Sequence, residues 1–268
     1  MTAGISPALG VILRGVPRIG RAAFLAALSE ILGANQRFVY VPNGTDTTTS
    51  VESSTVGATI TWDATIAARV TRQGNGYVQS FNGTDDYGDV PDSANLTFGN
   101  STVDQALTFL ALINPTDNAA VRTILSKFGA SSTGEYRLAL TAAHRLQLFL
   151  TDASGSINVN RLSDSGVTVP IGEWSLVAAT YDGTGGSTAM NGATLYRNAA
   201  GMASTATNNA SYVAMENQVS PFELGSQQTH IAPFAGSMGL VAMTQKALTP
   251  AEHQQVRQLC RRHFGVSL

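Results

Sequence analysis

FNGTDDYGDVPD, residues 81–92, is the stretch that decides the fold of this 268-residue chain. Just before it, residues 77–81 (YVQSF) follow the two-residue period of a half-buried β-strand. The Asn-Gly pair at 82–83 tolerates the positive φ that a tight reversal needs. Apolar spacing then resumes at Tyr87 and Val90. The stretch therefore predicts a strand, a turn and a second strand inside an all-β module.

Three carboxylates in this stretch, Asp85, Asp86 and Asp89, admit two interpretations. Clustered oxygen ligands on a turn suit calcium. Aspartates also cap turns by accepting hydrogen bonds from their own backbone. The ligand spacing of an EF-hand loop is not present in the sequence. Turn capping is the favoured interpretation, and calcium binding stays open as the alternative.

Strand candidates recur along the chain, separated by turn residues. They are residues 37–41, 59–62, 67–71, 107–113, 122–128, 136–141, 145–151, 156–161, 173–181, 194–198, 222–224 and 236–243. No helical pattern of ten residues interrupts this series, which argues against a parallel βαβ architecture. We predict an all-β fold, a two-sheet antiparallel sandwich. Residues 42–44 (Pro-Asn-Gly) end the first of these strands, and the Thr/Ser-rich segment 45–54 that follows is expected to be an exposed loop.

Two amphipathic helices are expected at the ends of the chain. Residues 24–32 place apolar side chains at helical spacing before Gly33, a typical helix stop. Thr249 and Glu252 form a capping box around a proline, which predicts a C-terminal helix. The first helix either closes the base of the sandwich, which we favour, or docks on a partner protein.

Composition and charge limit the possible functions. Only 13% of residues are charged, and no apolar run reaches the length of a transmembrane helix. Residues 1–37 and 246–268 each carry a charge of +3 and leave −8 between them. Basic ends on an acidic body fit arms that dock on an acidic neighbour, or an ordinary solvated surface. A pI of about 6.1, without a basic patch among aromatics, argues against nucleic-acid binding.

The sequence carries no signal for export or for a cofactor. The single cysteine, Cys260, excludes an intrachain disulfide and a zinc site built on several thiolates. Prolines and arginines interrupt the residues before the apolar run 22–28, so we expect no secretory signal and synthesis in a reducing cytoplasm. The glycine-rich residues 183–186 lack the Lys-Ser/Thr of a phosphate loop. We therefore expect no cofactor.

Six segments, taken in order, resemble the laminin-G-like, concanavalin-A-like lectin/glucanase jelly-roll superfamily over residues 58–262. They are residues 81–92, 106–115 (ALTFLALINP), the hairpin 134–140 with 145–150, 173–183 (EWSLVAATYDG), 194–198, and 234–243 with 248–252. Residues 13–28 (LRGVPRIGRAAFLAAL) and the tail 264–268 resemble extensions of laminin-G-like proteins encoded in tailed-phage virion gene clusters. The resemblance implies a jelly-roll domain at 38–268 behind an N-terminal arm and short helix at 1–37.

The first functional hypothesis is a structural virion protein. The resemblance implies a capsid decoration or another head or tail surface subunit, made in the host cytoplasm. Its partners would be other virion chains, as a homo-oligomer or in a capsid lattice. The docking residues we expect are Arg14, Arg18, Arg21, Phe24 and Leu28.

The second hypothesis is a carbohydrate-binding module for host or environmental glycans, acting through the concave sheet or the loops 41–57, 152–158 and 182–193. The candidate glycan-binding residues are Trp62, Asp152, Asn158 and Asp182. Trp62 either stacks on a sugar or packs in the core, whereas strand alternation places Trp174 in the core.

Catalysis and metal binding are not expected from the sequence. The seven glutamates are far apart, and no pair has the strand-alternating spacing that an acid and a nucleophile need for glycoside hydrolysis. The four histidines, His144, His230, His253 and His263, are too scattered to suggest a metal site. We expect no enzyme and no metal centre.

Overall fold

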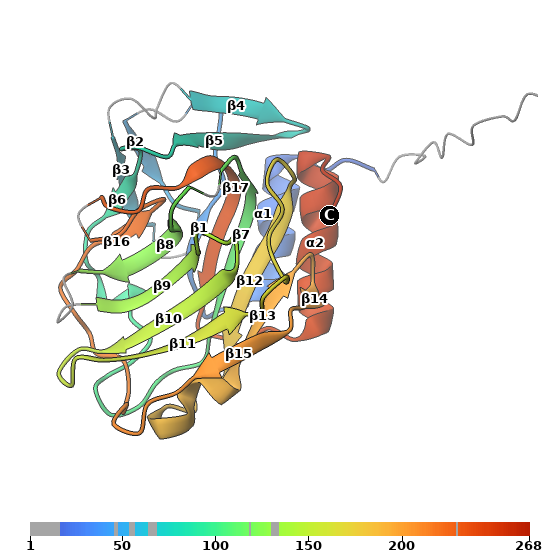
Figure 1. The fold of residues 1–268 in the computed structure, drawn as a ribbon. Helices are drawn as coiled ribbons and strands as arrows, with labels where there is room; N and C mark the ends of the chain where they lie inside the picture. The colour runs from blue at the N-terminus through green and yellow to red at the C-terminus, as the bar shows by residue number, and fades with distance from the viewer. Residues whose placement is uncertain are drawn as a thin grey trace, which may run out of the picture.

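The computed structural model describes residues 17–45, 48–53, 57–63, 69–117, 119–129, 134–228 and 230–268. Within these ranges, seventeen strands form two antiparallel sheets packed face to face, and two helices lie outside them (Figure 1). The prediction of an all-β, two-sheet jelly-roll sandwich is confirmed.

Sheet A has eight strands. Its order is β14 (Ala200–Gly201), β13 (Ala193–Arg197), β12 (Ser175–Tyr181), β7 (Leu107–Pro115), β17 (Ala235–Thr244), β5 (Gly76–Asn82) and β4 (Val70–Gln73), with β1 (Gln36–Tyr40) also pairing with β17.

Sheet B has nine strands. Its order is β15 (Ser204–Thr207), β11 (Ile157–Ser163), β10 (Leu146–Asp152), β9 (Gly134–Leu140), β8 (Arg122–Phe128), β16 (Phe222–Leu224), β6 (Gly88–Val90), β3 (Thr59–Trp62) and β2 (Thr49–Val51). Short 3-10 helices lie at η2 (Ala94–Leu96) and η3 (Gly186–Gly192).

Sheet A is covered on both faces, which explains the near-continuous apolar runs of its central strands. In β7, Phe109 and Ala111 point into the core between the sheets, while Leu110 and Leu112 point toward the helices. All seven residues of β12 are buried, as its two uncharged faces predicted. Strands buried on both faces have no need for polar alternation.

The helices α1 (Arg21–Leu32) and α2 (Pro250–Phe264) cover the outer face of sheet A (Figure 1). In α1, Phe24 stacks on His263 at 4.7 Å between ring centroids and meets Phe264 edge-on at 5.7 Å. Phe24 and Leu28 are fully buried in this layer. The expectation that these two residues dock on a partner is therefore wrong, because the protein's own helices and sheet already cover them.

Helix α2 forms as its local signals predict. The Thr249 side chain accepts from the backbone N–H of Glu252, and the Glu252 carboxylate accepts from the N–H of Thr249 at 2.8 Å. Gly265 ends the helix in the left-handed conformation at φ 67°.

The side chain of Asn82 organises the turn within residues 81–92. Asn82 Oδ1 accepts from the backbone N–H of Thr84 at 2.8 Å and of Asp85 at 3.1 Å. Asp86 is fully buried, accepts from the Asn82 N–H and pairs with Arg69. Asp85 is exposed, whereas Asp89 belongs to β6. The three carboxylates thus have separate surroundings, and Asp86 caps the turn.

Several boundaries differ from the expectations. Strand β2 forms inside the segment 45–54 that was expected to be a loop, because buried Ser50 pairs opposite Ile60 of β3. The expected strand 67–71 begins outside the described residues and appears as β4. The expected arm residue Arg14, with the rest of residues 1–16, also lies outside them. The proposed boundary between residues 37 and 38 falls inside β1.

Candidate functional site

Trp62 is a core residue, not a sugar platform. Its side chain is buried, its Nε1–H donates to Ser50 Oγ at 2.8 Å, and its ring packs against Tyr40 and Phe81. The expectation of sugar stacking at Trp62 is wrong because a sugar cannot reach either ring face. Trp174 lies just before β12 and is half-buried against the helix-side core.

The other three expected glycan residues lie at or next to strand ends: Asp152 ends β10, Asn158 is near the start of β11, and Asp182 follows β12. Asp152 is buried, and its carboxylate accepts from the N–H of Gly155 at 3.1 Å and of Val213 at 3.0 Å. Asn158 is exposed, and its Oδ1 accepts from Thr151 Oγ1. Asp182 is exposed and accepts from the Thr184 N–H at 2.9 Å. Asp152 therefore organises its own loop, while Asn158 and Asp182 remain accessible.

A polar cavity of about 480 Å³ lies beside η2, where the sequence predicted no site. Four parts of the chain form its wall: Arg37 of β1, η2 with Thr97, residues 99–105, and residues 216–217. The lining residues are Arg37, Ala94, Asn95, Thr97, Gly99, Asn100, Ser101, Gln105, Glu216 and Asn217. This volume lies within the range of small-ligand sites.

The amide side chains of the cavity are arranged to donate hydrogen bonds. Asn100 Oδ1 accepts from the N–H groups of Thr102 and Val103, and Asn217 Oδ1 accepts from Thr97 Oγ1 at 3.0 Å. Both amide oxygens are thus occupied, which leaves the NH₂ groups as donors.

Two further side chains in the lining also carry N–H groups that can donate hydrogen bonds. Within the described ranges, the side-chain amide of Gln105 makes no hydrogen bond, and Arg37 Nε is buried without an acceptor. Among the described lining residues Glu216 is the single carboxylate, and it already accepts from the Ser154 N–H at 2.9 Å. Such a set of donors suits a ligand rich in hydroxyl groups.

A buried ion cluster holds one wall of this cavity. Glu135 Oε1 accepts from the Gln218 N–H at 2.8 Å and from Thr97 Oγ1 at 3.3 Å. Lys127 bonds Glu135 and the Gln218 carbonyl, and pairs with Asp92 at 2.9 Å. Burial raises the pKa of Glu135 to about 7, and the neighbouring Lys127 charge opposes this rise. The cluster connects the segment after Asn217 to sheet B.

Neither helix covers the outer face of sheet B (Figure 1). Strand register places one row of side chains across this face: Thr61, Asp89, Glu223, Ser126, Arg137, Phe149 and Asn160. The Arg137 guanidinium lies 5.1 Å from the Phe149 ring centroid, within the range of a cation–π contact.

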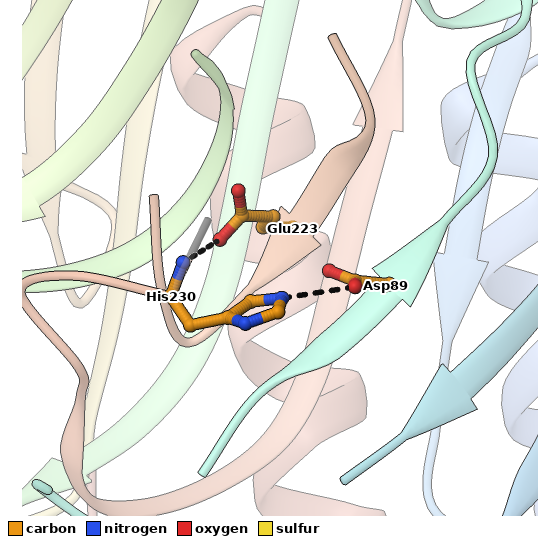
Figure 2. Close-up of side chains that lie close together, drawn as sticks. All are labelled: Asp89, Glu223 and His230. Atoms are coloured by element: carbon orange, nitrogen blue, oxygen red, sulfur yellow. Dashed lines mark hydrogen bonds and ion pairs between the residues drawn. The ribbon is translucent and has the colours of Figure 1, made fainter. Parts of the chain in front are cut away.

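Asp89 and Glu223, near one edge of this row, meet His230 from the loop after β16 (Figure 2). His230 Nε2 lies 3.0 Å from Asp89 Oδ2, and the His230 N–H donates to Glu223 Oε2 at 3.3 Å. One ligand atom from each residue lies within 4.8 Å of the others. The expectation that the histidines are too scattered for a metal-ligand group is wrong for His230.

Tyr87 completes the surroundings of this cluster. Its ring stacks on His230 at 3.3 Å between centroids with an interplanar angle of 6°. Burial and then the charges of Asp89, Asp63 and Glu223 raise the pKa of Tyr87. The cluster is therefore a region of negative potential.

The sequence matches the family model described as the concanavalin A-like lectin/glucanases superfamily over residues 82–252. This chain belongs to that family. No curated protein matches the sequence.

Solved structures agree on the fold. The botulinum neurotoxin serotype G binding domain aligns with a TM-score of 0.62 at 13% identity, over 83% of this chain and 50% of that one. The binding domain of Paraclostridial Mosquitocidal Protein 1 gives 0.61 at 12%, over 84% and 52%. Domain 4 of AbnA, an extracellular arabinanase from Geobacillus stearothermophilus, solved with arabinotriose, gives 0.57 at 19%, over 83% and 98%.

The chain thus spans about half the length of the toxin binding domains it matches and nearly all of the arabinanase domain. At these identities the likeness establishes the fold alone. Among the described residues, no helix is both long and apolar enough to cross a membrane.

Proposed function

We propose that this protein is a lectin-like module that binds a glycan in the polar cavity beside η2. The observation that carries the proposal is the lining of that cavity, in which several side-chain amides gather while the Oδ1 atoms of Asn100 and Asn217 accept hydrogen bonds from the protein. Sugar hydroxyls accept hydrogen bonds from such groups. The arabinotriose bound to the similar AbnA domain supports a sugar as the ligand class.

The proposed role is binding without hydrolysis. Glycosidases of the usual kind place two carboxyl groups on opposite sides of the scissile bond. Within the described residues, Glu216 is the single carboxylate in the cavity lining. Its Oε1 and Oε2 both accept hydrogen bonds, from the Ser154 N–H and from Gln218 Nε2. A single carboxylate that already accepts these two hydrogen bonds favours a structural role for Glu216 over a catalytic one.

The test is a glycan array followed by calorimetry on the best ligand, with arabinotriose as the first soluble probe. Gln105→Ala and Asn95→Ala each remove a side-chain amide that makes no hydrogen bond to another described residue. We expect each variant to weaken binding about 3- to 10-fold, which corresponds to the loss of one ordinary hydrogen bond.

Asn158→Ala is the matched control, because it removes an exposed amide from the β10–β11 hairpin outside the cavity lining. Binding by this variant should equal that of the wild type. Loss of binding in Asn158→Ala, with the two cavity variants unaffected, would move the site to the hairpin. An array without signal at high protein concentration would remove glycan binding altogether.

A second candidate is assembly into a phage virion through the N-terminal arm. It is favoured by the meeting of the two basic ends: the Ile19 N–H donates to the Arg262 carbonyl at 3.2 Å, and Arg262 Nε donates to the Pro17 carbonyl at 3.1 Å. Exposed Arg18 therefore lies beside the end of α2 with Arg261 and Arg262. Such a basic surface fits an acidic neighbour.

Arg21 is not part of that exposed surface. Its guanidinium donates to the Val41 carbonyl and to Ser53 Oγ, so it holds α1 on the sandwich. The assembly hypothesis is tested by co-sedimentation with phage particles, comparing the full chain with a chain that lacks residues 1–20. Equal association of both chains, or association of neither, would exclude docking through the arm.

A further inference from the structure

Asp89 of β6 and Glu223 of β16 are directly opposite each other in adjacent strands. Their side chains therefore lie on the same face of sheet B, the face that the helices leave uncovered. Like charges in this position destabilise a sheet. A cation between the two carboxylates removes the repulsion.

Asp89 also has an unused oxygen. Its Oδ2 pairs with His230 Nε2, but its Oδ1 is shielded from solvent and accepts no hydrogen bond from any described residue. A buried acceptor without a donor is costly and rare in folded proteins. This observation is independent of the charge pairing, and it also indicates a positive ligand that protein atoms do not supply.

The spacing of the three side chains fits a small coordination sphere (Figure 2). Ligand atoms about 2.0 to 2.1 Å from a tetrahedral zinc ion lie roughly 3.3 Å from one another. Asp89 Oδ2 and His230 Nε2 are already 3.0 Å apart, and the ligand atoms of all three residues are within 4.8 Å. Ion binding therefore requires the most distant ligand atoms to approach each other by at most about 1.5 Å.

Neighbouring groups hold the ligands in place. Glu223 Oε2 accepts from Ser226 Oγ and from the His230 N–H, so the strand and the loop are connected through Glu223 itself. The Tyr87 ring lies flat against the imidazole and fixes its plane. Partners of this kind orient the ligands in metal sites.

We propose that Asp89, Glu223 and His230 bind one divalent cation of the zinc type, with water as a further ligand. One imidazole with two carboxylates is a nitrogen and oxygen donor set that suits zinc, whereas calcium and magnesium prefer oxygen alone. The side chains of Asp89 and His230 are each 33% exposed, so an ion and a water molecule can reach them. The site does not depend on the proposed glycan cavity.

The experiment is calorimetry of the tag-free full chain, stripped with chelator and titrated with Zn²⁺. We expect one ion per chain. At a hundredfold excess over Kd, zinc should raise the Tm by about 5 to 10 °C, since an ion that binds the folded state alone stabilises it. Asp89→Asn and His230→Gln should each weaken binding at least about 10-fold.

Asp85→Asn is the matched control, because it makes the same change at an exposed aspartate four positions earlier, whose carboxylate accepts a hydrogen bond from Asn82. Its zinc binding should equal that of the wild type. Circular dichroism of the metal-free variants checks that each is folded, and Co²⁺ uptake gives a visible spectrum that reports the coordination geometry.

No zinc uptake by the wild type would overturn the proposal, as would unchanged uptake by folded Asp89→Asn and His230→Gln. Preference for Ca²⁺ over Zn²⁺ at the same residues would overturn the assignment of the ion. Loss of uptake in Asp85→Asn would place the ion at the turn instead.

Discussion

His253 offers a sharp test of the helix layer that covers sheet A. Its side chain is buried between α2 and the sheet, where the ring stacks on Tyr196 at 4.1 Å between centroids. Its Nε2 makes no hydrogen bond to any described residue. Burial lowers the pKa of His253 from 6.5 to about 4, and the charge of Glu252 opposes this shift only in part.

The sign of the effect on stability follows from proton binding. In the unfolded chain His253 takes up a proton near pH 6.5, whereas the folded protein resists protonation until about pH 4. The contribution of the neutral His253 side chain to the free energy of unfolding is therefore fully present above pH 6.5 and is lost as the pH falls toward 4. A pKa shift of this size corresponds to a change of about 3 kcal/mol in the free energy of unfolding.

The perturbation is His253→Leu, which keeps a buried apolar side chain of similar size and removes the titration. Urea unfolding of both proteins is measured between pH 7.5 and pH 4. As the pH falls over this range, the free energy of unfolding of the variant should rise by about 3 kcal/mol relative to that of the wild type. The loss of stacking on Tyr196 changes the difference between the two proteins equally at every pH and does not affect this comparison. Parallel pH profiles of the two proteins would refute the burial of a neutral imidazole under α2.

Two further predictions concern the helix layer and the cavity wall. Phe24→Ala should lower the free energy of unfolding by about 3 to 5 kcal/mol, because it leaves a cavity among His263 and Phe264; a loss below about 1 kcal/mol in urea unfolding would contradict the packing of α1. The folded wild type keeps the Glu135 proton up to about pH 7, whereas the unfolded chain releases it near pH 4.5, so the wild type should lose stability as the pH rises between these values. Glu135→Gln has no proton to release there and should not show this loss. Thermal unfolding at pH 5 and pH 7.5 checks this, and an unchanged pH dependence would contradict it.

Local signals predicted most of the fold. The Asn82-Gly83 turn, the capping box at Thr249 and the alternation of residues 175–181 each depend on neighbours in the sequence, and each forms as expected. Segment 45–54 was misjudged because Thr and Ser are common in loops, while β2 depends on pairing with a separate strand.

The candidate sites depend on contacts between distant parts of the chain, so the sequence did not reveal them. His230 and Asp89 are separated by 141 positions, and a loop after β16 brings them together. The cavity joins Thr97 to Asn217 across 120 positions. The run of amides at Asn95, Asn100 and Gln105 was the one local signal for that cavity. Trp62 was misjudged because its burial depends on Tyr40 and Phe81.

The most direct test of glycan binding in the cavity is an NMR titration that follows the side-chain NH₂ resonances of the labelled protein. With the best array ligand, or with arabinotriose, the resonances of Asn95, Asn100, Gln105 and Asn217 should shift together and saturate with one Kd. Shifts confined to Asn158 and its hairpin, or no shifts at millimolar sugar, would contradict the account.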